Sequence, residues 1–299
     1  GDVYKRQVPV NINGFTPQNF SMQFEGAVPA SEALARSLNI PAVTMLQRYG
    51  VPKFHHLLQQ MEFKTINRTA SHYGLSLILG GAEATLWDVT NAYAQMGRSL
   101  SSSPSPTVSQ GKEAQILLET ENTEQINNDT KQTSRNHKSN HNKQEKREQS
   151  NSSPLSVEED SEETTSAKTG AAWLTLSALT EVNRPEEIDW KSIPSMQTIA
   201  WKTGTSYGFR DAWAVGVTPR YTVGVWVGNA TGEGKPGLVG AQTAGPVLFD
   251  IFSYLPSSPW FERPTGVFVD AEICRQSGHL KGRFCEETDT LPSSRHSIC

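Results

Sequence analysis

Apolar residues recur at every third or fourth position through most of the first 100 residues, which is the spacing of amphipathic helices. The stretch Pro29–Leu38 offers Ser31 as an N-cap, and Pro41–Gly50 has a proline in its first turn and a glycine where a helix should end. A third helix is expected from about Pro52. The capping-box pattern Thr85-Leu-Trp-Asp88 predicts the start of a further helix. This part of the chain is therefore expected to be mainly helical.

The pattern changes to strict alternation near residue 198, which is typical of β-strands. It predicts three strands, Thr198–Thr203, Asp211–Val217 and Tyr221–Val227, and the short connection between the last two makes them an antiparallel hairpin. One face of the second strand carries only small side chains, which suits close packing of a helix. The stretch 243–252, with Thr243 as its N-cap, is expected to be that helix. The pattern predicts an α+β fold in which helices cover an antiparallel sheet.

Between these parts, residues 101–168 lose the hydrophobic pattern, since seven of the 68 are Val, Ile, Leu, Met, Phe, Trp or Tyr. Such a segment buries too little apolar surface to offset its ordering entropy, so we expect a disordered insertion. A helix is expected to resume over 171–185. We expect one domain over 8–255, truncated at its N-terminus, followed over 256–299 by a linker and the start of a strand-containing module that is also cut short.

Charge and cysteine content narrow the function classes. A net charge of −4 with no basic stripe argues against a nucleic-acid surface, and no apolar run reaches the length of a membrane span. The three cysteines are Cys274, Cys285 and Cys299. A Cys274–Cys285 disulfide and ordinary free cysteines are both compatible with the sequence. Two cysteines without a second Cys or His pair do not make a zinc site, and neither a metal nor an organic cofactor is implied.

The tetrad Lys202-Thr203-Gly204-Thr205 closes the first predicted strand. Its ammonium group and two hydroxyls suit a substrate carboxylate, and the glycine lets a ligand approach the backbone. If Thr205 lies on an exposed sheet edge, its N–H would point at a developing oxyanion. The tripeptide recurs at Lys168-Thr169-Gly170, between the polar segment and a helix, where it is expected to lead into that helix and to carry no chemistry.

Ser37-Leu38-Asn39 is the second candidate. Pro41 disfavours helical backbone just before it, so this tripeptide is expected at a corner between two helices. A corner would present the Ser37 hydroxyl and the Asn39 amide side by side, suited to relay a proton and to bind a peptide carbonyl. Taken alone, such a pair is more often two ordinary turn residues.

Three stretches in this order, EALARSLNIPAV, LGGAEATLWDVTNAYAQMG and KTGTSYGFRDAWAVG, resemble the transpeptidase domain of class A penicillin-binding proteins, most closely their 1C branch. The resemblance covers about 10–100 and 170–255. It implies the fold shared by penicillin-binding proteins and serine β-lactamases, and an enzyme that transfers an acyl group through a serine on the D-Ala-D-Ala stem peptides of peptidoglycan. Three motifs converge in that family: Ser-x-x-Lys, Ser-x-Asn and Lys-Thr-Gly.

The resemblance implies roles for the residues that match these motifs. Ser37 would relay a proton to or from the leaving amine, and Asn39 would bind the substrate backbone. Lys202, Thr203, Gly204 and Thr205 would form the substrate-binding wall: the three side chains would hold the terminal carboxylate, and the Thr205 N–H would give half of an oxyanion hole. Ser37, Asn39, Lys202 and Thr205 are the expected catalytic residues.

The first motif departs from the family pattern. The single Ser-x-x-Lys of the sequence is Ser109-Gln-Gly-Lys112, which lies in the polar insertion and follows Ser-x-Asn instead of preceding it. A flexible segment does not hold a nucleophile against its base, so we do not expect Ser109 to be the nucleophile. The nucleophile is expected upstream of this sequence, and the chain alone is expected to be inactive.

The resemblance also implies partners and a location. They are peptidoglycan stem peptides, the lipid-linked precursor and covalently bound β-lactams, at the periplasmic face of a bacterial inner membrane, with a membrane anchor upstream. A D-Ala-D-Ala carboxypeptidase or a β-lactamase-like hydrolase shares the same three motifs and differs in its acyl acceptor. A non-catalytic protein that binds peptidoglycan or β-lactams would use the same pocket. An upstream Ser-x-x-Lys distinguishes the enzymes from the binding protein.

Overall fold

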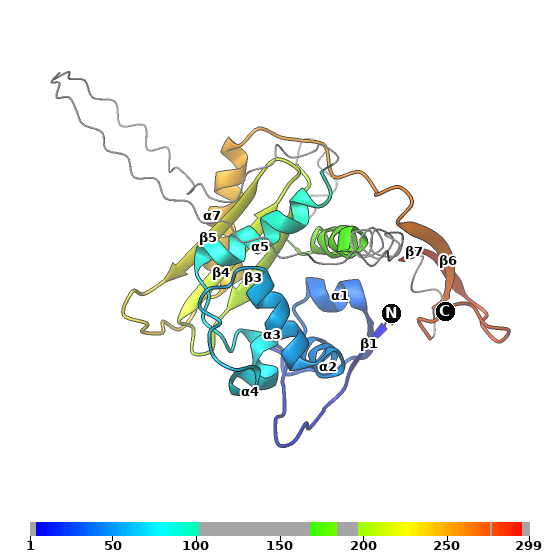
Figure 1. The fold of residues 1–299 in the computed structure, drawn as a ribbon, viewed down its shortest axis with the longest axis horizontal. Coiled ribbons are helices and arrows are strands. Elements are labelled where there is room, and N and C mark those ends of the chain that lie inside the picture. Colours follow the sequence, from blue (N-terminus) through cyan, green and yellow to red (C-terminus); the bar gives the residue numbers. More distant parts are fainter. Residues whose placement is uncertain (1–3, 102–167, 184–196, 276, 295–299) are drawn as a thin grey trace, which may run out of the picture.

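A three-stranded antiparallel sheet forms the centre of the chain, in the order β3-β4-β5 (Figure 1). Its strands are β3 (Ala200–Thr205), β4 (Asp211–Val217) and β5 (Thr222–Gly228). The structure is a computed structural model that describes residues 4–101, 168–183, 197–275 and 277–294. The predicted α+β fold with an antiparallel, helix-covered sheet is confirmed, and so is the hairpin of β4 and β5.

Helix α7 (Gly240–Tyr254) packs against the small-residue face of the sheet, as predicted. A Cβ added at Gly216 would lie 2.5 Å from the Phe252 ring, so only glycine admits the helix this closely. The prediction of Thr243 as its N-cap is wrong, because α7 begins three residues earlier, after Val239. Thr243 lies inside the helix, where its hydroxyl donates to the Val239 carbonyl at 2.8 Å.

Helix α5 (Leu86–Arg98) covers the opposite face. Gly224 is the register partner of Val215, one residue before the Gly216 that faces α7, and successive strand residues point to opposite faces. A Cβ at Gly224 would collide with Thr90 of α5. The predicted cap of α5 is confirmed, since the Thr85 hydroxyl accepts from the Asp88 N–H at 3.0 Å. The sheet is thus enclosed between two helices.

The predicted helical part is confirmed but begins with two strands that the sequence pattern did not reveal. β1 (Tyr4–Gln7) pairs with β2 (Gly26–Pro29), and four residues each are too short to show alternation. The helices are α1 (Ala30–Ala35), α2 (Asn39–Tyr49), α3 (Val51–Gln60) and α4 (Ala70–Tyr73), followed by the 3-10 helix η1 (Gly74–Leu79). A separate small core under them consists of Leu46, Ile66, Tyr73 and Leu77.

Two of the predicted helix boundaries can be compared with the structure. Gly50 ends α2 as expected, with a φ of 100° that favours glycine. Ser31 is not an N-cap, because β2 runs directly into α1 through Pro29 and Ser31 lies inside the helix. The cap position therefore carries no side-chain hydrogen bond.

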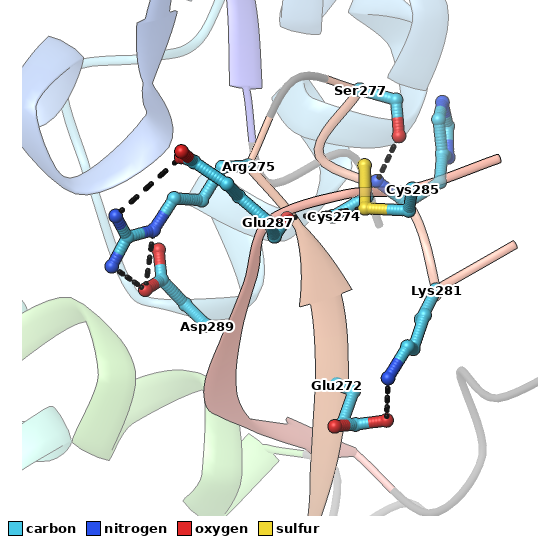
Figure 2. Close-up of a disulfide and its surroundings, with 9 residues drawn as sticks. Glu272, Cys274, Arg275, Ser277, Lys281, Cys285, Glu287 and Asp289 are labelled. Carbon is cyan, nitrogen blue, oxygen red and sulfur yellow. Dashed lines mark hydrogen bonds and ion pairs between the residues drawn. A yellow bond between two sulfur atoms is a disulfide. The ribbon is translucent and has the colours of Figure 1, made fainter.

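The C-terminal strands β6 (Phe268–Cys274) and β7 (Thr288–Ser294) form a two-stranded sheet of their own. The Cys274–Cys285 disulfide is present, with Cα atoms 5.8 Å apart, and it lies beside the ion pair of Arg275 with Asp289 (Figure 2). The division of the chain at 255/256 stays a prediction.

Residues 168–179 are helical and pack against β6. A Cβ at Gly170 would lie 2.7 Å from the Val267 side chain, and the Trp173 and Phe268 rings are 5.4 Å apart. The expectation that Lys168-Thr169-Gly170 leads into a helix needs a correction, because all three residues are already helical. The glycine is there for close packing, and Lys168 is exposed.

The expected insertion falls almost entirely on 102–167, outside the described residues, and Ser109 lies there with it. Within the described ranges, no helix combines the length and the apolar character needed to cross a membrane.

Candidate active site

β3 is an edge strand, and it carries the whole tetrad. The sequence pattern ended this strand at Thr203, but pairing with β4 continues to Thr205, which is opposite Ala212. Within the described part of the chain, β3 pairs with β4 alone, so its other edge is free. Gly204 does not break the strand, because its neighbour Trp213 packs over it, with the Trp213 Cβ 3.5 Å from where a Cβ of Gly204 would lie.

The backbone of Thr205 has a defined direction at this edge. The next residue, Ser206, donates its N–H to the Asp211 carbonyl at 2.9 Å, so Ser206 faces β4. Along an antiparallel strand, successive N–H groups point alternately toward the partner strand and away from it. The Thr205 N–H therefore points to the free edge, the direction that an oxyanion role requires.

The structure brings Lys202 to Ser37 across a sequence separation of 165 residues. The Lys202 Nζ contacts the Ser37 Oγ and also donates to the Thr203 carbonyl at 2.7 Å. Burial of the amine lowers the pKa of Lys202 from its ordinary 10.5 to about 8. An amine with this pKa is mostly protonated at pH 7 and half protonated near pH 8, so it exchanges a proton with a neighbouring hydroxyl more readily than an ordinary lysine.

Ser37 lies where helices usually place a glycine. Its φ is 56°, in the left-handed region. The Ser37 N–H bonds to the Leu34 carbonyl at 3.1 Å and the Leu38 N–H to the Ala33 carbonyl at 2.9 Å, which together form the Schellman ending of α1. A residue with a Cβ costs about 1 kcal/mol or more in this conformation. A serine in a position that favours glycine points to a role for its hydroxyl.

Asn39 is the first residue of α2 and is held by a preceding loop. Its Nδ2 donates to the Gln18 carbonyl at 2.8 Å, and its backbone N–H donates to the Asn19 Oδ1 at 3.0 Å. No sequence motif points to Gln18 or Asn19, and both lie about 20 residues from Asn39. The predicted corner between two helices is confirmed, but it is shorter than expected, because Asn39 and Ile40 are already helical in spite of Pro41.

The two threonines of the tetrad lie on the other face of β3 from Lys202, by strand alternation. The Thr205 Oγ1 accepts from the Gly240 N–H at 3.0 Å, at the start of α7. Its hydroxyl proton is still available to an acceptor at the free edge. Gly240 has no room for a side chain, since an added Cβ would collide with the Gly204 carbonyl. Helix α7 thus holds the end of β3 that carries the Thr205 N–H.

The chain is similar to known proteins in sequence and in fold. No protein-family model matches the chain. The chain is 31% identical to penicillin-binding protein 1C of Escherichia coli (strain K12) over 277 residues, which is 91% of this chain and 29% of that protein. It is 23% identical to penicillin-binding protein 1B of Vibrio cholerae, over 95% of this chain and 32% of that protein. The chain therefore spans about a third of the length of these relatives.

Two solved structures share the fold. Penicillin-binding protein 1A of Haemophilus influenzae superposes with a TM-score of 0.61 at 18% identity, over 97% of this chain and 44% of that one. The PonA1 protein of Mycobacterium tuberculosis, in complex with penicillin V, superposes with a TM-score of 0.55 at 16% identity, over 88% of this chain and 66% of that one. At such identities the structures show a common fold.

Proposed function

Because the chain carries a transpeptidase-like domain of the penicillin-binding protein kind, we propose that it is the D-Ala-D-Ala transpeptidase part of a bifunctional, peptidoglycan-cross-linking cell-wall synthase. The observation that carries the proposal is the contact between the Lys202 ammonium and the Ser37 hydroxyl, which unites the Lys-Thr-Gly and Ser-x-Asn motifs. Neither motif is specific alone.

The residues have distinct roles in the proposed acyl transfer. The D-Ala-D-Ala carboxylate lies at the free edge of β3, where the Lys202 ammonium reaches it from one face of the strand and the hydroxyls of Thr203 and Thr205 from the other, and the scissile carbonyl lies along the same edge. The Thr205 N–H stabilises the oxyanion, with Gly204 leaving room for the backbone of the substrate. The amide of Asn39 binds the peptide, and Ser37 passes a proton between Lys202 and the leaving amine. A second amine then takes the acyl group.

The nucleophile is proposed to come from outside this sequence. The single Ser-x-x-Lys present is at Ser109, in the polar segment outside the described residues. We propose that a Ser-x-x-Lys serine in a preceding part of the protein faces β3 and forms the acyl-enzyme with the stem peptide, or with a β-lactam as an inhibitor. We also propose that the lipid-linked precursor and a membrane anchor belong to that part, and that the domain works at the periplasmic face of the inner membrane.

Labelling with a fluorescent penicillin tests the proposal on the full-length protein. We expect Lys202→Ala to slow acylation by about 100-fold or more, the scale seen when one group that stabilises the transition state is lost. Lys168→Ala is the matched control, since Lys168 stands in the same tripeptide but is exposed on a helix, and it should label like the wild type.

Three outcomes would contradict the proposal. Equal slowing in both lysine variants would remove the basis for choosing Lys202. A label that maps to Ser109, or one that survives Ser-to-Ala replacement in the preceding motif, would show a different nucleophile. Reversible penicillin binding without a covalent adduct would support a binding protein instead of an enzyme.

A further inference from the structure

Asn19 is a buried polar residue that no motif accounts for, with 3% of its surface exposed. Its Oδ1 accepts from the backbone N–H groups of Asn39 at 3.0 Å and Ile40 at 3.4 Å. Its Nδ2 donates to the Gln23 carbonyl at 2.9 Å. Asn19 thus ties a loop that precedes α1 to the first turn of α2.

Helix α2 depends on this contact for its N-terminal cap. The residue at the cap position is Leu38, which has no side-chain acceptor. The first N–H groups of a helix have no partner within the helix and need one from elsewhere. Asn19, distant in sequence, supplies the acceptor that a serine or aspartate at the cap position usually supplies.

The same loop also fixes the side chain of Asn39. The Gln18 carbonyl accepts from the Asn39 Nδ2 at 2.8 Å, so two consecutive loop residues hold the side chain and the backbone of Asn39. Ser37, two residues earlier, belongs to the Schellman ending of α1 through its N–H bond to the Leu34 carbonyl. Both ends of the Ser37-Leu38-Asn39 corner are therefore held.

We propose that Asn19 is a positioning residue of the acyl-transfer site, which orients Asn39 and holds Ser37 against Lys202 by capping α2 from the preceding loop. Asn19 itself touches neither substrate nor reacting atoms. The inference rests on the proposed function for its consequence in catalysis, but the positioning itself is a property of this chain alone.

The simpler alternative is that Asn19 only stabilises the fold. A cap that only stabilises would change the melting temperature and leave the Ser37–Lys202 contact as it is. A positioning residue also changes the surroundings of Lys202, because a displaced Ser37 admits water to the amine and relieves its burial. The ionisation of Lys202 therefore distinguishes the two.

The test compares three variants. Asn19→Ala removes all three hydrogen bonds, whereas Asn19→Asp keeps the acceptor for α2 but replaces the donor to Gln23 with a carboxylate oxygen that faces the Gln23 carbonyl. Asn11→Ala is the matched control, since the Asn11 Oδ1 also accepts a backbone N–H, that of Gly14 at 2.8 Å, but in an exposed turn of the same loop region. The pKa of Lys202 is measured in this chain by NMR titration of its ¹³Cε signal, assigned with Lys202→Arg. Acylation by fluorescent penicillin is measured in the full-length protein.

We expect Asn19→Ala to raise the pKa of Lys202 from about 8 toward its ordinary value and to slow acylation by about 10-fold or more, the scale of lost orientation. Asn19→Asp should keep most of the lowered pKa of Lys202 and most of the acylation rate, and Asn11→Ala should leave both quantities unchanged. If Asn19→Ala does not fold, Asn19→Ser, which is too short to reach both N–H groups, should give a partial change in the same direction.

An unchanged Lys202 pKa in folded Asn19→Ala or Asn19→Ser would overturn the inference, and so would a raised pKa with wild-type acylation. If the wild-type protein forms no acyl adduct, the proposed function fails, and the NMR titration still decides whether Asn19 holds the corner.

Discussion

Replacement of Ser37 by glycine and by alanine separates the conformation of this residue from its chemistry. Both changes remove the hydroxyl and its contact with Lys202, so both should abolish a proton relay. They differ in the backbone, because the φ of Ser37 is 56° and only glycine adopts this value without strain.

The size of the difference follows from two opposing effects. A Cβ in the left-handed region costs about 1–2 kcal/mol. The greater conformational freedom of glycine in the unfolded chain offsets about 0.5–1 kcal/mol of this difference. We therefore expect Ser37→Gly to be more stable than Ser37→Ala by about 1 kcal/mol in free energy of unfolding, while neither variant is acylated at the wild-type rate.

Urea unfolding at fixed pH measures this difference, with Ser31 as the control. Ser31 lies inside α1, where the order should reverse and glycine should be the less stable by up to about 1 kcal/mol. A Ser37→Ala variant as stable as Ser37→Gly would refute the left-handed conformation. Wild-type acylation of either Ser37 variant would refute the proton relay.

Two further predictions concern Lys202 and the contact between the sheet and α7. Folding lowers the pKa of Lys202 to about 8 from 10.5, so the unfolded chain binds more protons between these values, and the wild type should gain stability relative to Lys202→Met as pH rises from 8 to 10.5. Urea midpoints of both proteins across that range measure the gain, and a difference that stays constant or falls would contradict the buried amine. Gly216→Ala should destabilise by about 1–3 kcal/mol, because its Cβ would lie 2.5 Å from the Phe252 ring. Gly282→Ala, with open space at its Cβ, should change the melting temperature little, and equal effects of the two would contradict the packing of α7.

Much of the fold was predictable because its signals are local. Hydrophobic spacing marked the helices and the alternating strands, and the cap at Thr85 and the helix end at Gly50 depend on residues within one turn. Two wrong predictions, the N-caps Ser31 and Thr243, also have a local cause. Ser31 and Thr243 have the chemistry of caps, but the chain enters each helix earlier, through Pro29 and Val239. A capping residue type does not fix where the preceding segment turns into a helix.

By itself the sequence determined which residues match the expected motifs and which of two Lys-Thr-Gly copies adjoins a strand. Only the tertiary structure decided that Lys202 meets Ser37, that the Thr205 N–H points to a free edge, and that Asn19 caps α2. The physical reason is the distance along the chain between the residues that determine each feature. Helical spacing, strand alternation and turns depend on a few neighbouring residues, whereas the pKa of an amine, the direction of an edge N–H and a cap from a distant loop depend on which segments folding brings together.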